Sequence, residues 1–275
     1  MRKARVLFIS SEIFPYLEMN EQSKIARFLP QGIQERGKEI RTFMPRFGCI
    51  NERRNQLHEV IRLSGMNLII DDSDHPLIIK VASIQAARMQ VYFIDNEEYF
   101  QRKQTYRDAT GNFFTDNDDR SIFFGRGVLE TVKKLGWSPD IIHCHGWMTA
   151  LVPLLIKTSY KDDPMFHNSK VVYSLYGDQF SEPFNANFGK KILMDGLDTE
   201  HVTELTKPDY VSLSKLAMRW SDAVIQSSPE IHPDVEKAFK AISKPTLSYQ
   251  SPEEYVAAYD NFYDEAVIED SVLAE

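Results

Sequence analysis

The sequence predicts an α/β fold with three layers and a mostly parallel sheet. Short apolar runs that are typical of buried strands alternate with segments whose apolar residues recur at helical spacing. The first such unit is a strand at residues 6–10, a loop, and a helix that contains Ile25 and Leu29. Ligands of such sheets bind at the carboxyl ends of the strands. We therefore expect residues 11–21, a loop without glycine, to lie at a ligand site.

The other expected elements continue this alternation. Runs of β-branched and aromatic residues predict strands at residues 39–44, 58–70, 77–83, 91–95, 140–143, 170–175 and 223–226. Helical spacing predicts helices at residues 119–135, 146–160, 208–220 and 253–259. Gly136 is placed to end the first of these helices, and Ser228 with Pro229 is expected to open one more. Residues 99–117, irregular and rich in aromatic side chains, are expected on the surface.

Composition indicates an ordinary globular chain with ample core. The 275 residues are 43% hydrophobic and 26% charged, and the two cysteines suggest no disulfide framework. The sequence shows neither the pattern of a secretory leader nor an apolar run long enough to span a bilayer. We expect a protein of a reducing, cytoplasmic setting that does not enter membranes.

The net charge of −8 is concentrated at the end of the chain. No Lys or Arg follows Lys244, whereas eight acidic residues do, so the preceding residues are net neutral. A neutral body argues against nucleic acid as a partner. We expect a folded domain at residues 1–244 and an acidic, solvated helix and tail at residues 245–275.

Six motifs then resemble a known family. They are SSEIFP at residues 10–15, FLP at 28–30, MPRFG at 44–48, TDNDDRSIFFGRGVLE at 115–130, PDIIHCHGW at 139–147 and LSKLAMRWSDAVIQSSP at 213–229. In this order and spacing they resemble bacterial glycogen synthases and plant starch synthases, glycosyltransferase family five. The resemblance implies the N-terminal Rossmann-like domain of a GT-B fold, in an enzyme that moves glucose from ADP-glucose to an α-1,4-glucan with retention.

The first loop departs from the family pattern. Where the family has Lys-x-Gly-Gly, this chain has Glu18, Met19, Asn20 and Glu21. In the family the glycines let the backbone approach the donor diphosphate and the lysine neutralises it. A unit charge pair at about 4 Å near a protein surface is worth roughly 4 kcal/mol, so two carboxylates should abolish diphosphate binding. The alternative is that these four residues are simply a solvated polar loop.

Other positions of the family's sugar site are partly kept. The last histidine of His-x-His-x-Trp-His is Met148, which cannot orient a sugar hydroxyl. By resemblance, the candidate sugar-binding residues are Asp116, Asn117, His145 and Trp147.

Each of these candidates has a structural alternative. Asp116 suits a helix N-cap, and Trp147 with Tyr106, Phe113 and Phe114 suits core packing. His143 and His145 suit hydrogen-bonded structural histidines, since no further metal ligand is evident. We expect no metal and no cofactor, and we assign no catalytic residue.

Three functions stay open. The first is a pseudo-glycosyltransferase, inactive alone, that binds α-glucan or a partner protein. The second is the N-terminal half of an active glucosyltransferase that uses ADP-glucose and is completed by a separate C-terminal GT-B domain, since the roughly 35 residues after Lys240 cannot build one. The third is a structural or interaction domain. A partner, or a homodimer mate, would require an exposed apolar patch on the cleft face.

Overall fold

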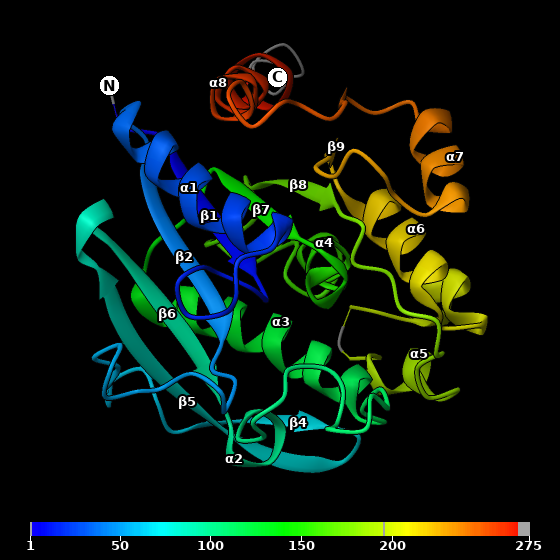
Figure 1. The fold of residues 1–275 in the computed structure, drawn as a ribbon. Coiled ribbons are helices and arrows are strands. Elements are labelled where there is room, and N and C mark those ends of the chain that lie inside the picture. Colours follow the sequence, from blue (N-terminus) through cyan, green and yellow to red (C-terminus); the bar gives the residue numbers. More distant parts are fainter. Residues whose placement is uncertain (1, 195, 269–275) are drawn as a thin grey trace.

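The computed structural model describes residues 2–194 and 196–268, and it shows a sheet between two layers of helices (Figure 1). The sheet order is β10-β9-β8-β7-β1-β2-β6-β5-β3, with β4 paired to β5. Its parallel strands are β1 Arg5–Ser10, β2 Glu39–Pro45, β6 Met89–Asp95, β7 Ile141–His145, β8 Lys170–Leu175, β9 Ala223–Gln226 and β10 Thr246–Leu247. Antiparallel pairing joins β3 His58–Glu59, β4 Met66–Ile70 and β5 Ser73–Ile84 to the edge at β6.

Helices cover both faces of the sheet, which confirms the three-layer α/β fold. They are α1 Glu21–Glu35, α2 Glu97–Phe100, α3 Asn117–Leu135, α4 Val152–Lys157, α5 Phe188–Lys191, α6 Tyr210–Trp220, α7 Pro233–Ala241 and α8 Tyr255–Phe262. Helices α1 and α8 bury their apolar residues against one face of the sheet, in a cluster that includes Phe8 and Ile141. Helices α3, α4 and α6 contribute to the larger cluster on the other face. Among the described residues, no helix is both long and apolar enough to cross a membrane.

Several expected boundaries were wrong. The single strand at residues 58–70 is two short strands, β3 and β4, separated by a turn that includes Gly65 at φ +84°. Strand β7 runs to His145, so both histidines of its motif belong to the strand. The helix expected at residues 146–160 is a 3₁₀ turn, Trp147–Thr149, followed by the short helix α4.

The helix expected to open at Ser228 begins later. Helix α7 starts at Pro233 and is capped by the side chain of His232, which accepts the Asp234 N–H. The Ser228 hydroxyl instead accepts the Gly177 N–H at 3.0 Å and donates to the carboxylate of Glu21. Ser228 thus ties the end of β9 to the loop after β8 and to the start of α1, and does not cap a helix.

We expected a solvated acidic helix at the end of the chain. Its described part, around α8, is instead packed onto the domain. Tyr255, Tyr259, Phe262 and Tyr263 are buried against α1 and the sheet. The Lys38 ammonium lies 2.7 Å from Asp260 and 2.9 Å from Asp264, so carboxylates of this segment also have a partner in the domain. The prediction rested on the number of acidic residues alone. It did not consider the aromatic residues that lie between them and pack against the domain. The expected tail at residues 269–275 lies outside the described residues.

Candidate functional site

The loops after β1, β7 and β8 meet the start of α1 at the carboxyl edge of the sheet. They enclose a cavity of about 340 Å³, here called the strand-end cavity. Its lining is Glu12, Asn20, Glu21, Gln22, Tyr106, Trp147, Tyr176, Gly177, Asp178, Gln179 and Ser228. A larger cavity of about 840 Å³ adjoins it and shares Glu12, Asn20 and Tyr106. The loop after β1 therefore lies at a cavity large enough for a ligand. This is the edge of a parallel sheet at which ligand sites are expected.

Carboxyl groups dominate the strand-end cavity. Its lining includes Glu12, Glu21 and Asp178, and contains no Lys or Arg. Asp178 accepts the Trp147 N–H and the Tyr210 O–H, each at 3.0 Å. Burial is the largest influence on this carboxyl and raises its pKa to about 6. At pH 7 the cavity is therefore negative and disfavours a phosphate group.

The loop that replaces the family's glycines closes the start of α1 with its own side chains. Asn20 accepts the Ser23 N–H at 2.8 Å, and its own N–H donates to the Ser23 hydroxyl at 2.8 Å. The Asn20 amide also donates to the carboxylate of Glu12. Helix N-termini bind anions through free N–H groups, and here one of those donors is already used. Glu18, Met19, Asn20 and Glu21 are all exposed, as a solvated polar loop would be.

Neither histidine of the β7 motif reaches the cavity. His143 and His145 are fully buried, with ring centroids 3.9 Å apart. His143 shares hydrogen bonds with Tyr263 and Ser174, and His145 Nδ1 lies 2.8 Å from the Tyr176 hydroxyl. Burial lowers the pKa of both rings. His145 is therefore not among the residues that could contact a ligand in the strand-end cavity. Its side chain instead supports Tyr176, which lines that cavity.

The other three sugar-binding candidates are dispersed. Trp147 lines the strand-end cavity but is only 5% exposed, and it packs edge-on against Tyr106 at 5.1 Å. Asn117 is buried and donates to the Tyr106 carbonyl, so it holds the aromatic loop in place. Asp116 lines neither cavity.

Asp116 also lacks the helix-capping role that was its alternative. It occupies the N-cap position of α3, but its side chain makes no cap hydrogen bond. The carboxylate instead forms an ion pair with Arg102, whose Nη1 lies 2.8 Å away.

The structure adds residues that the sequence did not single out. Glu12 lies within the first motif, and Asp178 lies three residues after the strand expected at residues 170–175, so position relative to strand ends was the available signal. Gln22 is buried and donates to Ser10, Ser11 and the His145 carbonyl, which joins α1 to two strand ends. Gly146, at φ +74°, allows the side chains of Asp178 and Gln22 to approach the backbone. A Cβ at this position would lie 2.6 Å from Asp178 and 2.7 Å from Gln22.

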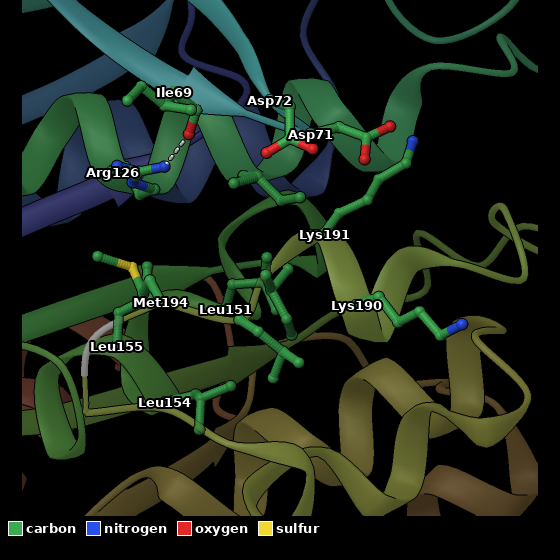
Figure 2. Close-up of a pocket in the computed structure, with 13 residues that line it drawn as sticks. Ile69, Asp71, Asp72, Arg126, Leu151, Leu154, Leu155, Lys190, Lys191 and Met194 are labelled. Carbon is green, nitrogen blue, oxygen red and sulfur yellow. Dashed lines mark hydrogen bonds between the residues drawn. The ribbon is translucent and has the colours of Figure 1, made fainter.

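A further cavity lies away from these residues. It lies between the β4–β5 turn and the helices α3, α4 and α5 (Figure 2). Its volume is about 570 Å³. Leucines of α4 form an apolar floor, and its rim carries Asp71 and Asp72 opposite Lys190 and Lys191. Lys191 is already paired with Asp118 and Asp119. None of the site residues expected from the sequence lines this cavity.

The fold and the strand-end cavity define a doubly covered α/β domain with a ligand site at the carboxyl edge of a parallel sheet. Within that class, a family model described as "Starch synthase catalytic domain" matches residues 5–243, and the chain belongs to this family.

Relatives agree with this assignment. A glycogen synthase of Chlorobium chlorochromatii (strain CaD3) is 37% identical over 195 residues, which are 70% of this chain and 40% of the relative. A glycogen synthase of Chlorobaculum tepidum (strain ATCC 49652 / DSM 12025 / NBRC 103806 / TLS) is 34% identical over 255 residues, 87% of this chain and 51% of the relative. The chain thus spans about half or less of the length of these relatives.

A solved structure shares the fold. The catalytic domain of starch synthase IV from Arabidopsis thaliana, bound to ADP and acarbose, has a TM-score of 0.74 and 19% identity. The match covers 91% of this chain and 52% of that one.

Proposed function

We propose that this chain is a non-catalytic member of the starch synthase family that binds α-glucan at its carboxyl edge and does not bind a sugar nucleotide. The observation that carries the proposal is the lining of the strand-end cavity, with three carboxyl groups and no Lys or Arg. Carboxylates repel a diphosphate but accept hydrogen bonds from the hydroxyls of a neutral saccharide. The Arabidopsis relative is described with both ADP and acarbose. We propose that this chain keeps the saccharide function of the family alone.

A protein partner at this edge is the weaker form of the proposal. Docking surfaces for proteins usually present a contiguous apolar patch. Among residues 2–194 and 196–268, the exposed large apolar side chains are Met19, Phe28, Ile61 and Ile69, and of these only Met19 lies in the loops at the cavities. The lining of the strand-end cavity combines polar and acidic groups with Tyr106, Trp147 and Tyr176, which suits a hydroxyl-rich ligand better.

The second candidate is the N-terminal half of an active glucosyltransferase that is completed by a separate C-terminal GT-B domain. It is favoured by the match of residues 5–243 to the starch synthase catalytic domain. This candidate requires ADP-glucose to bind when a C-terminal half is present. The charge of the strand-end cavity opposes it, because a diphosphate would face Glu12, Glu21 and Asp178.

Glycogen in a native gel should retard the wild-type protein, and the double variant Glu12→Ala/Glu21→Ala should lose most of that retardation. Hydrogen bonds to charged groups contribute about 1.5–3 kcal/mol, so the dissociation constant should rise by roughly tenfold or more. Glu59→Ala is the matched control, because Glu59 is an exposed carboxylate on the far edge strand β3. A wild type that migrates as if glycogen were absent, or a double variant as retarded as the control, would contradict glucan binding at this site.

A further inference from the structure

A basic pocket lies at the amino-terminal edge of the sheet, away from the strand-end cavity. Its volume is about 430 Å³, and we call it the amino-edge pocket. It is formed where the chain start, the end of α1, the start of β2 and the β5–β6 connection meet, and its lining includes Lys3, Lys38, Glu39, Arg41 and Arg88. In a chain of net charge −8, four cations around one hollow make it locally positive.

Three of these cations have no acidic partner among the described residues. Neither Lys3, Arg41 nor Arg88 takes part in an ion pair there. The charges of Lys3 and Arg88 are therefore free to act on a ligand, whereas Arg41 also acts on the Glu39 carboxylate in the same pocket.

The acidic groups near the pocket are already engaged. Glu39 accepts the Trp137 indole N–H at 2.6 Å and pairs with Arg5 at 3.3 Å. Asp260 and Asp264 pair with Lys38, and Asp260 also pairs with Arg36, so two cations offset these two carboxylates. The lining of the pocket is nevertheless net positive, with four cations against the single carboxylate of Glu39.

Arg41 is positioned as a binding group. Its guanidinium lies 5.9 Å from the ring centroid of Tyr92 and 5.5 Å from that of Trp137, so two aromatic side chains fix its orientation. Its Nε is buried and has no hydrogen-bond partner. The buried Nε therefore stays inside the fold, and contacts to a ligand in the pocket would come from the terminal Nη groups of Arg41. The planar fork of an arginine matches the oxygens of a phosphate.

We propose that the amino-edge pocket binds a small phosphate-bearing molecule, with Arg41 as the central contact and Lys3 and Arg88 as flanking charges. The volume suits a phosphate or a small phosphate ester. Neutral donors, Gln34 and Gln90, also line the pocket and would contact the ester part. The site is at the opposite edge from the strand-end cavity, so it does not depend on the glucan proposal.

Calorimetric titration of the full chain with inorganic phosphate, glucose 1-phosphate and glucose tests this site. We expect saturable binding of a phosphate-bearing probe and none of glucose. Binding of both phosphate probes would place recognition in the phosphate, and binding of the ester alone would add contacts to the sugar; both results support the pocket. If neither phosphate probe binds at concentrations up to about 10 mM, the proposal is overturned.

Two variants and a control locate the binding. Lys3→Ala/Arg88→Ala changes only exposed side chains, so it should fold normally and raise the dissociation constant about tenfold, with a weaker dependence on salt. Arg41→Gln should abolish saturation. Arg54→Ala removes an exposed cation that follows the carboxyl end of β2 and does not line the pocket, so it should leave binding unchanged. Equal affinity in the double variant and in Arg54→Ala would show that any phosphate binding is elsewhere, which also overturns the proposal.

Discussion

Replacing Tyr263 by Ala should destabilise the whole domain by about 3–5 kcal/mol, as is usual when a large buried aromatic side chain is removed. Tyr263 is fully buried, and its hydroxyl lies 2.5 Å from Nδ1 of His143 in the central strand β7. The substitution opens a cavity and leaves a buried histidine nitrogen without a partner. Urea unfolding monitored by circular dichroism measures the change in unfolding free energy.

Two companion variants separate packing from hydrogen bonding. Tyr263→Phe keeps the ring and should cost about 1–3 kcal/mol, because only the hydrogen bond to His143 is lost. Tyr249→Ala, on the same C-terminal segment but only half-buried, should change stability by less than about 1 kcal/mol. If Tyr263→Ala were no more harmful than Tyr249→Ala, the segment around α8 would not be an integral layer of the fold.

Acidification from pH 6.5 to pH 4 should weaken the fold through His145 by about 3 kcal/mol. Burial lowers the pKa of His145 from 6.5 to about 3, so between these values the unfolded chain binds a proton that the folded chain does not. The stability from neutral His145 is therefore complete above pH 6.5 and is lost progressively as the pH falls towards 3. His143 acts in the same direction, since burial and its neighbour His145 lower its pKa.

Asp178 acts in the opposite direction, so the contribution of His145 must be measured as a difference. The pKa of Asp178 is raised to about 6 in the fold, and protonation on acidification therefore adds stability. Because Asp178 titrates in both proteins, the gap between the pH profiles of wild type and His145→Gln isolates the histidine. We expect the variant to be the less stable at pH 7 and to lose that disadvantage near pH 4. Parallel profiles would contradict a neutral, buried His145.

The sequence predicted the strand pattern well where strands are buried on both faces. The limits of β8 at Lys170–Leu175 and of β9 at Ala223–Gln226 match the expectation. Strands of a parallel sheet that are buried on both faces read as short, nearly continuous apolar runs, and the ends of such runs mark the ends of the strands. The single strand predicted at residues 58–70 was wrong, because β3 is only two exposed residues long and the chain turns before β4, with Gly65 in that turn. Ser228 with Pro229 imitated a helix start, although its hydroxyl makes tertiary hydrogen bonds.

The candidate site was predicted less well than the fold. The sequence located the loop of Glu18 to Glu21 but not its partners, since Glu12, Asp178 and Ser228 meet it only after the strands align. The resemblance offered His145 and Asn117 as sugar-binding candidates, and tertiary packing buries both. For His145 the structure agrees with the stated alternative of a hydrogen-bonded structural histidine. A strand end indicates where a ligand binds, but the residues that line the cavity depend on loops from distant parts of the chain.

Calorimetric titration of the protein with ADP-glucose and with a linear α-1,4-glucan, at pH 7 and low salt, tests the central claim most directly. The acidic strand-end cavity predicts no saturable binding of ADP-glucose at millimolar concentration and saturable binding of the glucan. Saturable binding of ADP-glucose, weakened as salt rises, would show that a nucleotide site persists and would contradict the account.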